Sequence, residues 1–145
     1  SSRVQAVSEN YGPTDFLRMN DAPGRMEHDS PTSPESAFIG GPIQENPEQV
    51  QRANPITYVD PSDPPILMIH GRNDMSVPYN QSELLYEALQ HAGVTAKLVP
   101  VENAGHGFKP GPKEATISPS REEIQAMHID WFKKYLGDSQ ESAKK

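Results

Sequence analysis

The stretch that most constrains the fold is the apolar run PPILMIHG, residues 64–71. Two prolines open the run, and Gly71 closes it. Because its apolar side chains do not alternate with polar ones, a strand here would be buried on both faces. Strands of this kind are typical of parallel sheets that carry helices on either side. The run therefore predicts an inner strand of an α/β protein.

Strand and helix patterns alternate around this run. We expect strands in residues 3–7 and 95–102, with Pro100 placing the latter at a sheet edge or strand end. Strands alternating with helices imply right-handed crossovers and a three-layer α/β/α arrangement over a short parallel sheet of about three strands. The expected helices are a short one from Pro47 that ends before Pro55, one that opens with a capping box of Asn80 and Glu83 and stops at Gly93, and a last one within residues 118–137.

The last helix is expected to place Ile124, Met127, Trp131 and Tyr135 on one buried face, with Phe132 and Leu136 beside it. Residues 16–46 are polar and rich in Pro, Gly, Ser and Asp, with a small apolar patch at Phe38 and Ile39. We expect them to form an irregular excursion over the surface, with short helical turns. The length suits one domain, residues 1–137, followed by a flexible tail, residues 138–145.

Composition excludes several classes of function. The net charge is −7, and the only basic cluster is Lys144-Lys145, so we expect neither nucleic acid nor a membrane surface as a partner. No apolar run approaches the roughly 20 residues of a membrane span, and the first residues do not resemble a secretory signal. The chain has no cysteine and no paired histidines at metal-ligand spacing, so we expect no metal and no cofactor. The sequence does not indicate the cellular compartment.

Two loops carry the candidate chemistry, and each follows a predicted strand. Asp74 lies in GRNDMSVP, and His106 lies between two glycines in NAGHGF. The carboxyl ends of neighbouring parallel strands meet at one edge of a sheet, so these loops can bring a carboxylate to an imidazole. A carboxylate that holds one ring nitrogen leaves the other nitrogen free to act as a base. The alternative is that Asp74 turns its own loop and His106 is a surface residue.

The order of these motifs resembles the C-terminal half of the α/β-hydrolase family. HGRNDMSVP, a helix, a strand and GHGF carry the resemblance, and YGPTDF and PESAFIGGPIQEN narrow it. These motifs resemble the esterase and lipase branch, with acetyl esterases and acetylxylan or feruloyl-type carbohydrate esterases, which is related to the prolyl-oligopeptidase catalytic domain. The resemblance implies that Asp74 is the acid and His106 the base of a catalytic triad. It further implies a small-molecule or carbohydrate ester as substrate.

Residues near these loops have more than one interpretation. Met75 and Phe108 are candidates to line an acyl pocket, with plain packing as the alternative. Arg72 and Asn73 are expected to position the loop that carries Asp74. We expect a core or turn role for His70, a packing or surface role for His128 and a core position for Trp131.

Two features of the family are absent from this sequence. It contains neither a G-x-S-x-G nucleophile elbow nor an oxyanion motif of the H-G-G-G type. Ser36, Ser76 and Ser82 do not lie at a strand-to-helix turn, and Ser142 in the tail matches S-x-x-K by chance. We therefore expect the C-terminal portion of a serine hydrolase of carboxylic esters, inactive by itself. The alternatives are a serine peptidase portion of the prolyl-oligopeptidase type and a non-catalytic binding or assembly module.

A sheet whose first strand is residues 3–7 leaves one edge of that strand without a partner. An unpaired strand edge invites association between chains. The sequence therefore predicts self-association through the strand near residues 3–7, unless residues 16–46 fold over that edge.

Overall fold

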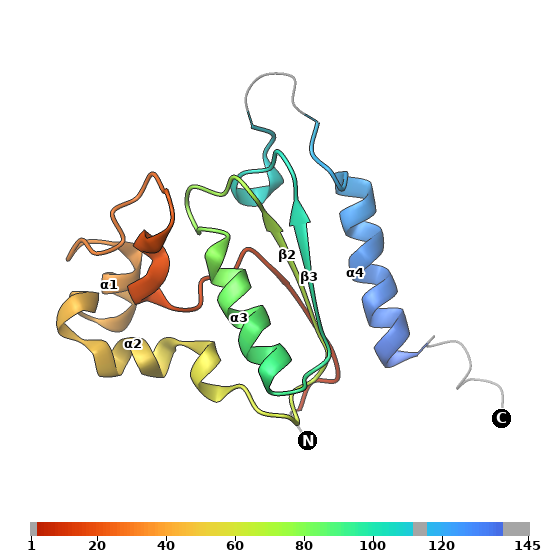
Figure 1. Cartoon of the computed structure of the whole chain (residues 1–145), viewed down its shortest axis with the longest axis horizontal. Helices are drawn as coiled ribbons and strands as arrows, with labels where there is room; N and C mark the ends of the chain where they lie inside the picture. Colours follow the sequence, from red (N-terminus) through yellow and green to blue (C-terminus); the bar gives the residue numbers. More distant parts are fainter. Residues whose placement is uncertain (1–2, 112–115, 138–145) are drawn as a thin grey trace.

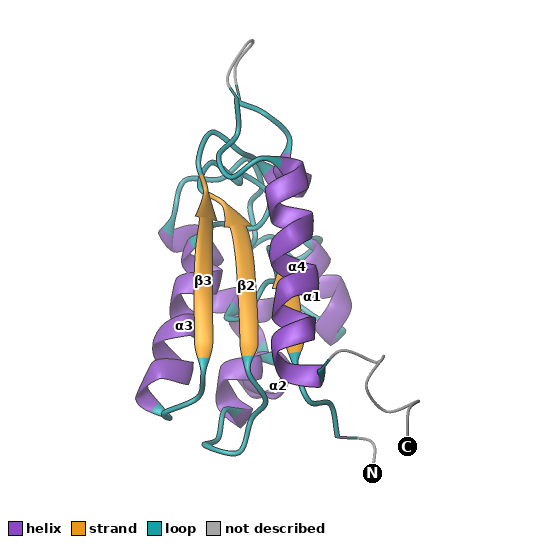
Figure 2. Cartoon of the chain, turned by 90° about the vertical axis from the view of Figure 1, so that its right-hand side faces the viewer, coloured by secondary structure: helices purple, strands orange, loops and turns teal. Residues whose placement is uncertain are grey.

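A computed structural model of the chain describes residues 3–111 and 116–137. Its strands β1 (Val7–Asn10), β2 (Ile66–Gly71) and β3 (Ala96–Val101) form a parallel sheet in the order β1-β2-β3. Helix α3 (Asn80–His91) lies on one face of the sheet and α4 (Arg121–Leu136) on the other (Figures 1 and 2). The predicted α/β class, with three layers and a short parallel sheet, is confirmed.

Strand β2 is buried on both faces, as its uninterrupted apolar run predicts. Leu67 and Ile69 pack against Trp131 on the α4 side. Met68 points to the opposite face, where it packs against Leu89 of α3. Side chains alternate across a strand, so one apolar run supplies the cores of both layers.

The first strand lies later in the chain than predicted. It covers Val7–Asn10 and not residues 3–7, because its start is set by pairing with β2. Val7 is in register with Ile66, and its N–H donates to the carbonyl of Pro65. The apolar residues before Val7 therefore precede the paired part of the sheet.

Strand β3 forms the other edge of the sheet, as Pro100 predicts. The N–H of Ile66 donates to the carbonyl of Thr95, and the N–H of Arg72 donates to the carbonyl of Val101. In a parallel ladder, the backbone groups of every second residue point toward the same neighbouring strand, so Thr95 and Val101 belong to the set of residues that point toward β2. Under this alternation position 100 faces away from β2. The missing N–H of Pro100 therefore breaks no hydrogen bond within the sheet.

Residues 16–46 are more ordered than an irregular excursion. They contain the 3₁₀-helix η1 (Phe16–Asp21), the helix α1 (Pro34–Ile39) and the 3₁₀-helix η2 (Ile43–Glu45), and α2 (Pro47–Ala53) follows. A small core of Phe16, Met19, Ile43 and Val50 holds them together. Phe38 is not part of this core and is 74% exposed, whereas its neighbour Ile39 packs against the core.

Helix α3 begins without the predicted capping box. Tyr79 occupies the N-cap, and the Asn80 side chain donates instead to the carbonyl of Arg18 in η1. A tertiary contact thus replaces the local cap. Gly93 follows the helix with a φ of +75°, the left-handed conformation that suits a glycine stop.

Helix α4 buries Ile124 and Trp131 as predicted, with Met127 and Tyr135 partly buried beside them. Phe132 and Leu136 were expected near this face, but they are 37% and 55% exposed. Neither residue belongs to the core that Ile124 and Trp131 form with the sheet. The bounds of the predicted domain, residues 1–137, remain a prediction, and the predicted tail, residues 138–145, lies outside the described residues.

Candidate active site

The carboxylate of Asp74 is buried in the loop that follows β2. Its Oδ1 accepts hydrogen bonds from the backbone N–H groups of Ser76 at 2.8 Å and Val77 at 2.9 Å. These bonds fix the side chain in one orientation and leave Oδ2 facing the loop after β3. The local turn that was the alternative role for Asp74 is therefore present, and its hydrogen bonds orient Oδ2 toward the loop after β3.

His106 lies in that second loop, at the start of the 3₁₀-helix η4 (His106–Phe108). Its Nδ1 is 2.9 Å from Oδ2 of Asp74, and its side chain is 46% exposed. An ionised carboxylate can only accept, so Nδ1 carries the hydrogen, and in the neutral form of the ring Nε2 has a free lone pair. The pair therefore presents a base at the surface, oriented by a buried acid.

Backbone contacts hold the two loops together. The N–H of Asn73 donates to the carbonyl of Ala104 at 2.9 Å, which continues the ladder between β2 and β3 into the loops. Gly71 permits this approach because a Cβ there would overlap the Ala104 carbonyl oxygen and lie 2.9 Å from the carbonyl oxygen of Gly105. A glycine at the end of β2 is thus required by the neighbouring backbone.

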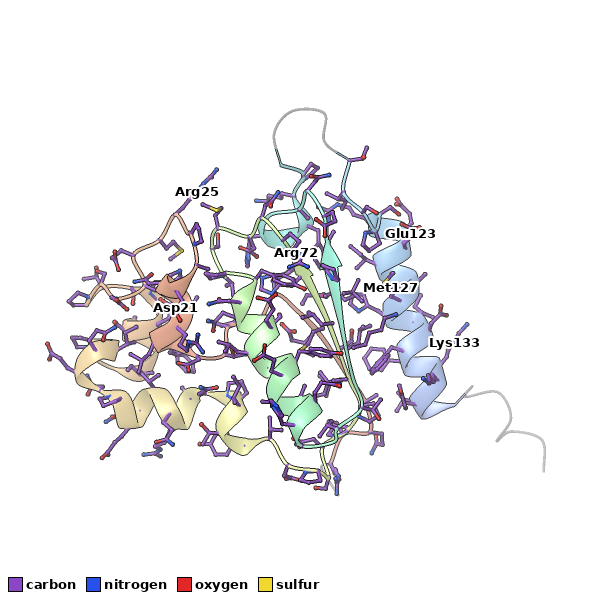
Figure 3. All side chains as sticks on the ribbon, viewed as in Figure 1. Asp21, Arg25, Arg72, Glu123, Met127 and Lys133 are labelled. Carbon is purple, nitrogen blue, oxygen red and sulfur yellow. The ribbon has the colours of Figure 1, made fainter. Side chains whose placement is uncertain are left out.

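Arg72 directly follows β2 (Figure 3), and its contacts connect both loops to α3. Its guanidinium lies 4.3 Å from the centre of the Tyr79 ring and 3.6 Å from carboxylate oxygens of Glu83 and Glu102. These contacts stack the cation on an aromatic face and pair it with the first turn of α3 through Glu83 and with the residue after β3 through Glu102. They support the positioning role that the sequence suggested for Arg72.

His70 is fully buried behind Asp74. Its Nδ1 is 2.7 Å from Oγ of Ser82, and its Nε2 lies 2.9 Å from the carbonyl of Val77 and 3.5 Å from Oδ2 of Asp74. Because Nε2 faces two acceptors, it carries the hydrogen, and Nδ1 accepts from Ser82. This is the satisfied core role that the sequence favoured for His70.

The surroundings of Asp74 keep it ionised. Burial raises its pKa, but hydrogen bonds from His70, from the N–H groups of Val77 and Ser76 and from His106 together lower it from 3.8 to about 2. The acid therefore holds its charge throughout the range in which an imidazole base operates.

Tyr11 is a member of the site that residue-by-residue reasoning missed. Its ring centre is 4.7 Å from that of His106 and 5.2 Å from that of Phe108. It follows β1 with a φ of +45°, an unusual value for a residue with a side chain. In the sequence, YGPTDF contributes only to the family resemblance, and the strand predicted for residues 3–7 ends well before Tyr11. Tyr11 directly follows a strand only because β1 extends to Asn10.

The two candidates for substrate contact lie in different surroundings. Phe108 is buried in the main core, where its ring meets Tyr11 edge-on. Met75 is partly exposed, and its carbonyl accepts a hydrogen bond from the N–H of Arg25 at 2.9 Å. Packing accounts for the position of Phe108, and contact of either residue with substrate stays a prediction.

Within the described residues, no serine side chain forms a hydrogen bond with the His106 ring, whose only hydrogen-bond partner there is Asp74. Ser82 is bonded to His70, and Ser36 donates to the carbonyl of Ser30. Over the same residues, no cluster of three or more His, Asp or Glu side chains is placed to hold a metal ion.

A cavity of about 430 Å³ lies away from His106, on the α3 side of β1. It is mainly apolar, with Val7, Tyr58 and Leu85 among its lining residues. The carboxyl of Glu9 also reaches it, and burial raises the pKa of this group although it accepts a hydrogen bond from the N–H of Gly12 and lies near His70.

The sequence profile of the BD-FAE family matches residues 1–89, more than half of the chain. The chain belongs to the BD-FAE family. A truncated form of a carbohydrate esterase from gut microbiota is 32% identical, with a TM-score of 0.73 over 94% of this BD-FAE chain and 44% of that one. A bifunctional GH43-CE protein of Bacteroides eggerthii is 34% identical, with a TM-score of 0.69 over 94% of this chain and 17% of its own.

The curated relatives of this BD-FAE chain include an esterase and a peptidase. Esterase LipQ of Mycobacterium tuberculosis is 38% identical over 65 residues, which are 44% of this chain and 15% of LipQ. The uncharacterized peptidase YuxL of Bacillus subtilis is 29% identical over 94 residues, 63% of this chain and 13% of YuxL. The chain spans about a third (31%) of the length of another relative, a putative carboxymethylenebutenolidase of Escherichia coli.

Solved structures of lower identity support the fold alone. An acylaminoacyl peptidase is 20% identical, with a TM-score of 0.69 over 97% of this chain and 21% of that one. The BD-FAE chain thus has the architecture of part of an α/β-hydrolase and belongs to its esterase branch. None of the helices that the structure describes is long and apolar enough to span a membrane.

Proposed function

We propose that this chain supplies the acid and the base of a serine hydrolase that cleaves carboxylic esters. The observation that carries the proposal is the 2.9 Å hydrogen bond from Nδ1 of His106 to the buried, ionised Asp74. A buried acid behind an exposed imidazole, both on loops after parallel strands, is the arrangement that activates a hydroxyl nucleophile. The esterase names among the relatives favour an ester as the substrate.

In the proposed reaction Nε2 of His106 removes the proton of a serine hydroxyl as its oxygen attacks the ester carbonyl. The imidazolium then returns that proton to the departing alcohol, and an acyl-enzyme remains. Water attacks the acyl carbon by the same route, with His106 again as base, and releases the carboxylic acid. Asp74 holds Nδ1 and stabilises the imidazolium in both steps.

We infer that the serine and the oxyanion hole lie outside these 145 residues. The sequence has no G-x-S-x-G, and the described serines do not reach His106. Removal of a triad leaves a residual rate that depends on the oxyanion hole and on substrate binding. Here the motifs for the nucleophile and for the oxyanion hole are both missing from the sequence. The chain alone is therefore inactive, and the complete hydrolase acts on a small-molecule or carbohydrate ester.

The test compares this chain with a longer protein that carries it behind a nucleophile segment. With p-nitrophenyl acetate, the 145-residue chain should give no hydrolysis above buffer, and the longer protein should turn over. In the longer protein His106→Ala should lower kcat by roughly 10⁴- to 10⁶-fold, and Asp74→Asn by about 10⁴-fold. His91→Ala, an exposed histidine at the end of α3, should leave kcat unchanged.

Two results would contradict the proposal. Hydrolysis by the purified chain that is lost with Ser76→Ala would place the nucleophile within it. A longer protein with no activity toward esters, but with activity toward a peptide anilide, would favour the peptidase alternative suggested by YuxL.

A further inference from the structure

The loop that carries His106 turns through two consecutive residues with positive φ. Gly107 has a φ of +68° and Phe108 a φ of +54°, in the left-handed region that a residue with a bulky side chain seldom adopts. The turn lets Phe108 enter the core while His106, two residues earlier, faces Asp74. A residue such as Phe108 keeps this conformation only where its surroundings hold it there. The orientation of His106 therefore depends on the contacts of the residues that follow it.

Arg121, the first residue of α4, makes such a contact. Its Nη2 donates to the carbonyl oxygen of Gly107 at 3.1 Å and to that of Phe108 at 2.9 Å. The start of α4 and the loop of His106 lie at the same end of the sheet (Figures 1 and 2). One nitrogen can bond both carbonyl groups only while the loop stays turned, and a charged donor makes the stronger kind of hydrogen bond. The contact therefore favours the conformation with two positive φ angles.

The position of Arg121 in its helix favours a role outside the helix. A cation in the first turn opposes the helix dipole, whereas Glu122 and Glu123 in the same turn suit it. The capping box of Ser120 and Glu123 starts the helix without Arg121. Within the described residues, both hydrogen bonds of its guanidinium go to the His106 loop. The contact with that loop, and not the start of α4, therefore accounts for an arginine at this position.

The other contacts of the turn do not replace this one. Asp74 holds Nδ1 of the His106 ring, which is at the end of a side chain. The backbone of the turn is joined to itself, from the N–H of Phe108 to the carbonyl of Gly105 at 3.0 Å. Among the described residues, Arg121 is the side chain that ties the backbone of the turn to another element.

We propose that Arg121 is a positioning residue for His106. By holding the carbonyl groups of Gly107 and Phe108, it keeps the turn in the conformation in which Nδ1 of His106 meets Asp74. Nε2 then stays available to a nucleophile, and Arg121 itself takes no part in the proton transfer. The catalytic consequence rests on the proposed function, whereas the position of His106 can be measured in this chain alone.

NMR spectroscopy of the 145-residue chain tests the position of His106. In the wild-type chain, the Nδ1 proton bonded to Asp74 should give a downfield signal. Arg121→Ala should weaken that signal and raise the exchange of the proton with water by about tenfold or more, because the loop opens more often. Arg121→Lys, whose ammonium group can still donate to carbonyl oxygens, should retain most of the signal. Arg52→Ala, at an exposed arginine of α2, is the matched control and should leave it unchanged.

The free energy of unfolding separates positioning from a general loss of stability. Arg121 is exposed, so its hydrogen bonds compete with water and add little to this free energy. Urea unfolding of Arg121→Ala should therefore resemble that of Arg52→Ala, although the two differ in the downfield signal. If Arg121→Ala does not fold, Arg121→Gln takes its place, since glutamine is too short to reach both carbonyl groups and should also lose the signal.

In the longer hydrolase, the substitution should act on the chemical step. Arg121→Ala should lower kcat by about 10- to 100-fold and change KM by less than about twofold, because a misplaced base weakens transition-state stabilisation more than substrate binding. In the Asp74→Asn background, the same substitution should lower kcat by less than about threefold, because the hydrogen bond through which Arg121 acts is already altered.

Three results would overturn the proposal. These are a downfield signal that Arg121→Ala leaves as strong as in the wild type, an equal loss of the signal in Arg52→Ala, and a KM that rises without a fall in kcat. If the longer protein has no esterase activity, the NMR result alone decides whether Arg121 positions His106. The failure of this proposal and that of the proposed function are therefore distinguishable.

Discussion

At the residue scale, the charge of Asp74 matters for stability as well as for chemistry. Its carboxylate accepts from two backbone N–H groups and from His106 while it is shielded from solvent. Each of these bonds needs the ionised form or is strongest with it. The folded state therefore binds a proton at this group less readily than the unfolded chain does.

This difference predicts a specific loss of stability in acid. The folded pKa of about 2 lies below the unfolded value of 3.8, so Asp74 contributes stability above about pH 4 that is lost as the pH falls toward 2. The contribution is about 2 kcal/mol at most. Urea unfolding should show the free-energy difference between wild type and Asp74→Asn shrinking by this amount from pH 5 to pH 2. A difference that does not change with pH would contradict the expectation.

At the scale of elements, α4 has strong local signals at its start. The Ser120 side chain accepts from the N–H of Glu123, and the Glu123 side chain accepts from the N–H of Ser120. Acidic residues in the first turn and lysines in the last turn also suit the helix dipole. The helix is therefore specified largely by its own sequence, although its buried face depends on the sheet.

Removal of the cap should measure this local contribution. Ser120→Ala leaves the N–H of Glu123 without its acceptor and should lower the free energy of unfolding by about 1 kcal/mol. Gln125→Ala, at an exposed position on the same helix, should change it by less than about 0.5 kcal/mol. Thermal unfolding followed by circular dichroism compares the two. Equal effects would mean that the capping box adds nothing.

At the scale of the whole molecule, the site depends on two chain segments that approach each other closely. Gly71 ends β2 and Ala104 lies in the loop after β3, and their backbones leave no room for a side chain at position 71. The distance between Asp74 and His106 is therefore set by the contact of two loops and not by either loop alone.

Gly71→Ala should disturb both stability and site. The added methyl group would overlap backbone atoms of Ala104, which cannot move aside without separating the loops, at a cost of about 1–3 kcal/mol. The downfield NMR signal of the His106 Nδ1 proton should weaken or disappear. Gly24→Ala, where the nearest atom to a new Cβ is 3.6 Å away, should retain that signal. A retained signal in both variants would show that the loops tolerate the methyl group.

Several features followed from the sequence alone. The unbroken apolar run predicted the buried inner strand β2, and Pro100 predicted an edge position. The order of strands and helices predicted the parallel sheet, and the sheet in turn brought the loops of Asp74 and His106 to one end. These predictions succeed because periodicity and proline reflect interactions between residues that are close in the sequence, and because the order of elements limits the possible topologies.

Only the tertiary structure decided the rest. Pairing with β2 set the start of β1, a contact with η1 replaced the expected cap of α3, and Tyr11 came to lie against His106. The sequence placed Phe132 beside the buried face of α4, but the packing leaves it 37% exposed. In each case the partner is distant along the chain. A local sequence pattern does not identify such a partner, because the contact forms only when the segments pack together.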